Sequence, residues 1–365
     1  MSHIVGAKIR ALREELGLTQ EELAGSVGLS SEFISLLELG KRDPSLDSLS
    51  SLARFFKKDL SFFLAEVPDD LELFLKKKET APETRRLLRR FGKYCKDYLR
   101  LEEMAERTLR QAPLYSSLSA VKMAAEERRR LGLGLEPVPD MVALAERNGL
   151  RIALAPLIPE GEMAGVYVFY ESRQAAFSLI ESRTSPERRN FAAAHAYCHY
   201  LKDRFDGPII DTPDMLVDDY VSLYPGREQF AHRFATCFLM PPDRIRDLID
   251  REIRVESLRL ADVLYLRRYF GVELSQLAFF LEKMGLITSR TRQILLKTDQ
   301  RESEQALFGP DLQAKEPKGK GLIRSERFCS LALTAYQKGR IDLDALAKYL
   351  RKPKEKVRVY INRKI

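Results

Sequence analysis

Two histidines four residues apart, His195 and His199, constrain this chain more than any other feature of its sequence. They lie in the alanine-rich segment NFAAAHAYCHYLKD, which we expect to be helical, and residues at i and i+4 share one helix face. Two imidazoles on that face can hold one tetrahedral metal ion, as in the zinc motif H-E-x-x-H. In that motif the residue after the first histidine is a glutamate that acts as general base. Here that residue is Ala196, so the sequence predicts a metal-binding pair without the base.

A third metal ligand is available in a second amphipathic segment, REQFAHRFATCFLMPP, which ends at two prolines. Glu228 in this segment lies 29 residues after His199, a separation that allows a neighbouring helix to bring it to the histidines. Zinc held by two histidines and one glutamate, with a fourth position open to water, is a catalytic type of site. The pattern therefore predicts a zinc site made of His195, His199 and Glu228.

The residues before this site predict an α+β fold that is mostly helical. Residues 120–131 and 140–148 have the pattern of helices, and Gly149 is a typical helix stop. Three short apolar segments at 150–154, 165–170 and 174–180 predict strands of a small three-stranded sheet. Ser185-Pro186-Glu187 is a typical helix start, so the histidine helix is expected to follow the sheet directly.

Together these segments resemble the ImmA/IrrE family of zinc metallopeptidases. AHAYCH is similar to the family's AHELGH-like helix, and EQFAHRFATCFLMP is similar to its later segment E-x-x-A-N-x-F-A-x-x-L-M-P. The resemblance covers about residues 115–297 and implies a zincin-like fold with His195, His199 and Glu228 as zinc ligands. His232 stands where the family usually has Asn or Asp. It either supports the ligands or the transition state by hydrogen bonding, or is an ordinary helix residue.

Ala196 takes the place of the family's general base. Removing a general base slows a reaction on the order of 10²–10⁴-fold, so we expect the chain to be catalytically inactive. Ala196 is either a natural loss that leaves a sensor or an exchange introduced into a working peptidase. The otherwise intact ligand set favours the exchange, because degenerate enzymes usually lose ligands as well.

The first 65 residues predict a compact bundle of short helices. Thr19-Gln-Glu-Glu22 has the form of a capping box, Gly28 ends the helix that follows, and Ser30 or Ser31 caps the next helix at residues 32–37. Helix, short turn and helix is the arrangement of a DNA-reading unit.

The segment LTQEELAGSVGLSSEFISLLELGKRDPSLDSLSSLARFF resembles the helix-turn-helix of the phage-repressor-like (Xre) family. The resemblance implies two groups of DNA contacts. The second helix would enter the major groove with Ser30, Ser31, Glu32 and Ser35. Gln20, Lys41 and Arg42 would contact phosphate.

Positive charge is concentrated outside this unit. The chain has a net charge of +8, yet residues 1–65 contain 8 Lys and Arg against 9 Asp and Glu. Residues 76–100 contain 10 against 3, and residues 288–365 contain 19 against 9. Because phosphate contacts dominate affinity for DNA, the N-terminal unit alone should bind weakly, and dimerisation or the basic segments would have to help. The first basic segment is either a connecting helix with a solvated basic face, or a nucleic-acid contact or dimer arm. The second is either a solvated, lysine-rich docking unit or a contact for nucleic acid.

Composition shifts divide the chain into five expected parts. They are the helix-turn-helix domain at 1–66, a basic helical linker at 67–113, the peptidase-like domain at 114–298, a linker at 299–325 and a basic helical unit at 326–365. No apolar run approaches the roughly 20 residues of a membrane helix. The four cysteines are scattered and form no CxxC pair, which favours reduced thiols in a cytoplasmic protein.

These observations predict a repressor of double-stranded operator DNA with a built-in peptidase switch. By family resemblance, repression would end when the protein cleaves itself or another repressor after DNA damage or invasion, and the genes controlled would belong to defence or mobile elements. Single-stranded DNA is the candidate trigger, and a homodimer is expected because such repressors bind palindromes. The alternative is a non-proteolytic transcription factor that uses a degenerate peptidase fold as a ligand sensor.

Overall fold

A computed structural model describes most of the 365-residue chain: residues 5–6, 9–10, 12–13, 16, 18–56, 60, 82–157, 163–212, 216, 226–253, 257–309 and 322–361. The chain forms two compact units. One consists of Met1–Glu79 with Phe169–Ala175, and the other of Thr80–Val168 with Ala176–Ile365. Within the described residues, the helices are too short or too polar to cross a membrane.

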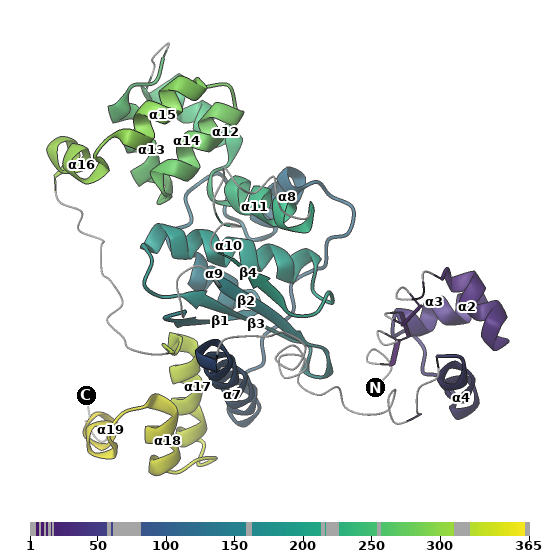
Figure 1. Cartoon of the computed structure of the whole chain (residues 1–365). Helices are drawn as coiled ribbons and strands as arrows, with labels where there is room; N and C mark the ends of the chain where they lie inside the picture. The colour runs from purple at the N-terminus through teal and green to yellow at the C-terminus, as the bar shows by residue number, and fades with distance from the viewer. Residues whose placement is uncertain are drawn as a thin grey trace. The chain divides into compact units, whose positions relative to one another are not determined.

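Three short helices form the centre of the N-terminal unit: α2 (Gln20–Val27), α3 (Ser31–Glu38) and α4 (Leu46–Phe55) (Figure 1). The predicted capping box is present, because the Thr19 side chain accepts a hydrogen bond from the Glu22 backbone N–H and the Glu22 carboxylate accepts one from the Thr19 backbone N–H. Gly28 ends α2 in the left-handed conformation with φ +71°, and Ser30 caps α3. The second helix is therefore one residue longer at each end than the predicted 32–37.

A nearly buried ion pair joins the first segment of this unit to α3. Arg13 Nε lies 2.7 Å from Glu38 Oε1, and Arg13 also donates to the Leu18 carbonyl. Gln20 Nε2 donates to Glu38 Oε2 at 2.8 Å. The same unit has a core of apolar side chains that includes Ile9, Leu23, Ile34, Leu37, Leu49 and Leu52.

The chain contains a mixed sheet of four strands, β1 (Leu150–Ala155), β2 (Gly165–Tyr170), β3 (Ala175–Glu181) and β4 (Ile209–Asp211), in the order β1-β3-β2-β4. β1 pairs with β3 in parallel, and β2 pairs with β4 in antiparallel. The predicted fold class is confirmed, but the predicted sheet lacked β4. A strand of three residues is too short to produce an alternating pattern in the sequence.

Helices cover both faces of this sheet (Figure 1): α7 (Pro82–Ala105) lies on one face, and α9 (Met141–Arg147) and α10 (Pro186–Lys202) lie on the other. Strand side chains alternate between the two faces. Arg151 of β1 and its register partner Phe177 of β3 both contact Tyr98 of α7. Helix α8 (Ala120–Arg130) and helix α11 (Gly226–Leu239) pack together, and α11 packs on α10.

The C-terminal helices are tied to α7 and β1 by buried polar contacts. They are α17 (Glu326–Gln337), α18 (Leu343–Leu350) and α19 (Lys354–Ile361). The Glu102 carboxylate of α7 accepts from Arg151 at 2.6 Å and from Arg327 at 3.1 Å. Glu146 accepts from Tyr98 and from Ser325. Residues near both ends of this unit therefore share one polar network with the sheet.

The remaining helices follow α11 in the chain. They are α12 (Pro242–Asp247), a π-helical segment Leu248–Ile253, α13 (Leu260–Phe270), α14 (Leu274–Lys283), α15 (Ser289–Lys297) and α16 (Gln300–Phe308). Arg267 of α13 pairs with Glu187 at the start of α10 at 2.8 Å and with Glu304 of α16 at 2.7 Å. This group is thereby anchored to the helix that carries the histidines.

Candidate metal centre and DNA-binding helix

Helix α10 begins where the sequence predicted. The Ser185 side chain accepts a hydrogen bond from the Arg188 backbone N–H, and Pro186 occupies the first turn, where a missing N–H costs no hydrogen bond. The helix is buried along its second half, and both His195 and His199 are fully buried. A buried pair of imidazoles needs partners inside the protein, because water cannot satisfy its nitrogen atoms.

Four side chains converge at this point: His195, His199, Asp211 and Glu228, whose ligand atoms all lie within 4.8 Å of one another. Glu228 Oε2 lies 3.2 Å from His195 Nε2 and 3.3 Å from His199 Nε2. Asp211 Oδ1 lies 3.5 Å from His195 Nε2 and 3.9 Å from His199 Nε2. The structure thus brings the three predicted ligands together and adds a fourth.

This cluster fits a tetrahedral zinc ion. Zinc bound to nitrogen and oxygen at about 2.0–2.2 Å separates neighbouring ligands by about 3.3–3.6 Å, which is close to most of the separations observed. His199 Nε2 and Asp211 Oδ1 are buried and have no hydrogen-bond partner among the described residues. Buried polar atoms without partners are rare and call for an explanation, and a metal ion at the centre of the cluster supplies one.

Asp211 is the site residue that sequence reasoning missed. It ends β4, the strand that was also missed, and it is buried. Its strand partner is Gly165, and a Cβ atom at Gly165 would lie 3.1 Å from Asp211 Oδ2. The glycine therefore leaves space for the carboxylate. The only signal in the sequence was one aspartate after two isoleucines, which is too weak to distinguish it from the chain's other acidic residues.

Asp203 orients one of the histidines. His199 Nδ1 lies 2.8 Å from Asp203 Oδ2, one helical turn further along. If Nδ1–H donates to this carboxylate, Nε2 carries the free lone pair that faces the cluster, which is the usual arrangement of a metal-binding histidine.

The carboxylates dominate the electrostatics of the cluster. Burial by itself lowers the pKa of His195, but Asp211 and Glu228 outweigh burial and raise this pKa to about 9. The pKa of His199 is also raised, because Asp203 and Glu228 outweigh burial. Burial raises the pKa of Glu228, but the adjacent imidazoles of His195 and His199 lower it more, so this pKa lies well below its usual value. The cluster therefore favours positive charge at its centre, which protons or a metal ion can supply.

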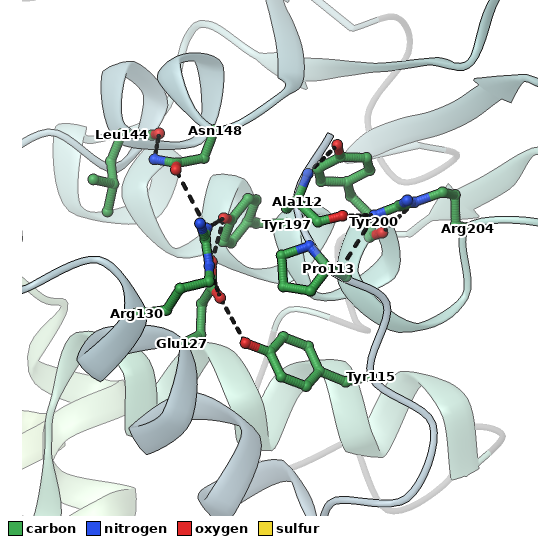
Figure 2. Close-up of polar contacts among 10 residues, drawn as sticks. All are labelled: Ala112, Pro113, Tyr115, Glu127, Arg130, Leu144, Asn148, Tyr197, Tyr200 and Arg204. Carbon is green, nitrogen blue, oxygen red and sulfur yellow. Dashed lines mark hydrogen bonds and ion pairs between the residues drawn. The ribbon is translucent and has the colours of Figure 1, made fainter. Parts of the chain in front are cut away.

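Polar contacts between α8, the segment before it and α10 hold the histidine helix in position (Figure 2). Glu127 of α8 is fully buried and accepts hydrogen bonds from Tyr197 of α10, from Tyr115 at 2.9 Å and from Arg130 at 2.7 Å. The Tyr197 ring packs against Phe238. Its hydroxyl, in addition, fixes the rotation of α10.

Tyr200 supports the same helix from another direction (Figure 2). Its hydroxyl accepts from the Ala112 backbone N–H at 2.9 Å, and the Arg204 guanidinium lies 4.3 Å from its ring centre. Gly149 has φ +105°, and a Cβ atom there would lie only 2.4 Å from the Tyr200 hydroxyl. A side chain at Gly149 would therefore displace the helix that carries the histidines.

Two other residues predicted for the metal centre, Ala196 and His232, do not belong to the group of clustered ligands. Ala196 is buried beside them and contributes only a methyl group. His232 lies on α11 one turn beyond Glu228, is nearly buried, and packs edge-on against Phe191 with ring centres 4.9 Å apart. It is not one of the four clustered side chains. The ring contact with Phe191 places His232 between α10 and α11.

The residues expected to contact DNA gather on α3 and the loop after it. Ser31 and Glu32 are exposed at the start of α3, Ser35 is half-buried on the same helix, and Lys41 and Arg42 are exposed in the loop.

Two of the expected DNA contacts are already engaged within the protein, and a third packs on α3. The Ser30 hydroxyl accepts from the Phe33 backbone N–H, and the Gln20 side chain donates to Glu38. The Arg42 guanidinium lies 4.8 Å from the Phe33 ring centre. For Gln20, a phosphate contact through the side chain would require this hydrogen bond to break.

Comparison with known proteins identifies both parts of the chain. The family described as "Helix-turn-helix" matches residues 9–63, and the family described as "IrrE N-terminal-like domain", a group of peptidases, matches residues 145–282. An HTH-type transcriptional regulator of Archaeoglobus fulgidus is 44% identical over 70 residues, which are 18% of this chain and 93% of the relative.

Two further relatives have similar names. The HTH-type transcriptional regulator y4dJ of Sinorhizobium fredii is 43% identical over 54 residues, 15% of this chain and 70% of the relative. The cryptic phage CTXphi transcriptional repressor RstR of Vibrio cholerae is 31% identical over 72 residues, 20% of this chain and 65% of the relative. Both resemblances found in the sequence are confirmed. The chain belongs to the HTH-type transcriptional regulators, and it combines an Xre-type DNA-binding helix-turn-helix domain with an IrrE-like peptidase-family domain.

Proposed function

We propose that this protein is a repressor of double-stranded operator DNA whose IrrE-like domain holds one zinc ion in a closed site and acts as its switch. The observation that carries the proposal is the convergence of Asp211 with His195, His199 and Glu228. A catalytic zinc site has three protein ligands and an open position for water, whereas a structural site has four protein ligands. Because a fourth buried donor faces the cluster, we infer that all four ligands come from the protein.

Ala196 supports the same conclusion. A zinc peptidase needs a general base beside the metal to activate water, and an alanine methyl group cannot accept a proton. We therefore expect no peptidase activity from this chain. A bound zinc ion would supply the positive charge that the buried carboxylates require. The protein ligands would join α10, β4 and α11, so that metal occupancy sets the packing of the domain.

A proteolytic switch is the second candidate, and it is supported by the retained ligands and by Asp203, which orients His199. With glutamate in place of Ala196, the protein would cut itself or another repressor after DNA damage or invasion, with single-stranded DNA as the signal. A cut within residues 66–82 would separate DNA binding from the rest of the chain. Apart from Pro82, these residues lie outside the described part of the chain. Defence or mobile-element genes are the proposed targets.

The test compares the unchanged chain, Ala196→Glu, and Ala196→Glu combined with Asp211→Asn. Each protein is loaded with zinc, incubated with and without single-stranded DNA, and analysed by intact mass. We expect the unchanged chain and the single variant to stay intact, because Asp211 still takes the position of water. Cleavage by the double variant would support a site derived from a peptidase. Cleavage by the unchanged chain would overturn the proposal, and cleavage by the single variant would show that Asp211 does not close the site.

Operator binding would use α3 and the loop after it, as the names of the relatives suggest. Each phosphate contact contributes about 0.9 to the slope of log affinity against log salt concentration. Replacing Lys41 and Arg42 by glutamine should therefore weaken DNA binding and lower that slope by about 2, whereas Ser31→Ala should change the preferred sequence. Because the N-terminal unit has a low net charge, one copy should bind DNA weakly, which favours a homodimer on a palindrome. We expect the protein to act in the cytoplasm. Analytical ultracentrifugation with and without operator DNA tests the dimer.

A further inference from the structure

A cavity of 690 Å³ lies between α7, the segment before α17, and α18. It joins the two basic segments that are far apart in the sequence. Arg90, Lys93 and Arg100 line it from α7, at helical spacings of three and seven residues that put them along one face of that helix. Arg324, Lys348 and Arg351 line it from the C-terminal segment. We call this cavity the α7–α18 pocket. Its volume lies within the usual range for small-molecule sites.

The positive charge of the pocket is poorly compensated. Of the seven Lys and Arg residues in its lining, Arg340 lies 3.5 Å from Glu106. The other six form no ion pair with another residue in the described ranges. Two aspartates line the pocket, and Asp342 is occupied as the cap of α18. Asp97 is the other carboxylate in the lining, and it is shared among Lys93, Arg324, Arg100 and Lys348.

A buried donor nitrogen of the pocket, Arg324 Nε, has no hydrogen-bond partner within the described residues. The Tyr94 side chain is 3% exposed, and its hydroxyl lies beside Ser325. Burial and the nearby charge of Arg351 lower the pKa of Arg324. Since buried donors normally find an acceptor, an anionic oxygen in the pocket would satisfy both the charge and the hydrogen bonds.

The rest of the lining is suited to an apolar or planar part of a ligand. Tyr349, Leu322, Ile341 and Met104 contribute ring or aliphatic surface. Tyr94 is held rigidly, because its ring stacks on Phe328 with ring centres 5.0 Å apart. A ligand for this pocket thus combines a multiply charged anionic group with an apolar or planar part.

We propose that the α7–α18 pocket binds a small organic phosphate, with its phosphate oxygens on the two rows of cations and its carbon part against the tyrosines. Arginine is well matched to phosphate because its planar group donates two parallel hydrogen bonds. A monocarboxylate would leave most of the six cations unpaired. A nucleic acid backbone would run along one basic surface, whereas here two basic walls face one cavity. The proposal does not depend on the zinc site.

Isothermal titration calorimetry on the full-length, zinc-loaded protein tests it. The probes are ADP, inorganic pyrophosphate, uncharged adenosine and a six-nucleotide oligothymidylate. We expect ADP and pyrophosphate to bind and adenosine not to bind. Lys93→Gln with Arg100→Gln should weaken ADP binding about tenfold or more, because each removes a charged contact. The matched control is Arg85→Gln with Arg86→Gln, two exposed cations of the same helix that do not line the pocket. It should change ADP affinity less than twofold.

A second pair of changes, Lys348→Gln with Arg351→Gln, removes charge from the opposite wall. It should weaken ADP binding to a similar extent, and circular dichroism would verify that each variant is folded. The proposal is overturned if neither ADP nor pyrophosphate binds at millimolar concentration, or if the control pair weakens binding as much as the pocket pairs. Tighter binding of the oligothymidylate than of ADP, lost in the pocket variants, would also overturn it and identify a nucleic-acid surface. Zinc content, measured in parallel, separates these outcomes from a failure of the metal site.

Discussion

The metal centre and the α7–α18 pocket both collect ionisable side chains from distant parts of the chain, but they differ in burial. The four donors of the metal centre are almost completely buried. In the pocket, Arg90, Lys93 and Arg100 are exposed. Water can solvate an exposed cation, so the pocket can fold without its ligand. Buried donors have no such alternative. The metal centre should therefore contribute to stability, and the pocket should contribute mainly to recognition.

Zinc removal should have the largest effect on stability. A ligand present at about 1,000 times its dissociation constant stabilises the folded state by about 4 kcal/mol, which corresponds to a fall of about 10 °C in melting temperature when the ligand is removed from a domain of this size. Dialysis against a chelator followed by calorimetry measures the change. Adding zinc back should restore the melting temperature, and magnesium should not. An unchanged melting temperature would contradict a zinc-dependent fold.

Replacing Asp211 should have the next largest effect, which is on zinc affinity. Asp211→Ala removes a proposed ligand, and we expect zinc affinity to fall about 100-fold, which is the upper end of the losses seen when only a supporting residue is removed. Asp203→Asn, which weakens the orientation of His199, should cost less. The absorption spectrum of the cobalt-substituted protein reports coordination. It should change on Asp211→Ala as a water enters, and an unchanged spectrum would show that Asp211 is not a ligand.

A methyl group at Gly165 provides a smaller perturbation of the same site. Gly165→Ala places a Cβ atom 3.1 Å from Asp211 Oδ2, and overpacking of this kind typically costs about 1–3 kcal/mol. We expect a lower unfolding free energy and weaker zinc binding together. Gly226→Ala is the control, because a Cβ atom at that position has open space around it. Equal effects of the two substitutions on zinc affinity would argue against a close approach between a Cβ atom at position 165 and the Asp211 carboxylate.

Neutralising the pocket should have the smallest effect on stability. It tests most directly whether the pocket, unlike the metal centre, contributes to recognition and not to stability. Lys93→Gln with Arg100→Gln removes exposed charges that have no ion-pair partner in the described chain, and surface changes of this kind usually alter stability by about 0.5 kcal/mol or less. Denaturant unfolding should therefore show a midpoint close to that of the unchanged protein, although ADP binding is weakened about tenfold or more. A large loss of stability would mean that these cations are structural.

The local features of this fold were predictable because they depend on neighbouring residues. The capping box at Thr19 and Glu22, the start of α10 at Ser185 and Pro186, and the shared face of His195 and His199 each depend on contacts within about one helical turn. The family resemblances rest on the same kind of short patterns, and they were confirmed.

The sequence by itself determined the two domain types, the helix-turn-helix and the helix that presents two histidines. Only the tertiary structure decided what surrounds them. Asp211 reaches the cluster because β4 pairs with β2, and strand pairing between distant segments leaves no periodic mark in three residues. The pocket exists because α7 packs against α17, which brings together two basic segments that are far apart in the sequence. Short-range patterns encode helices and their caps, whereas a site shared by remote segments is set by packing.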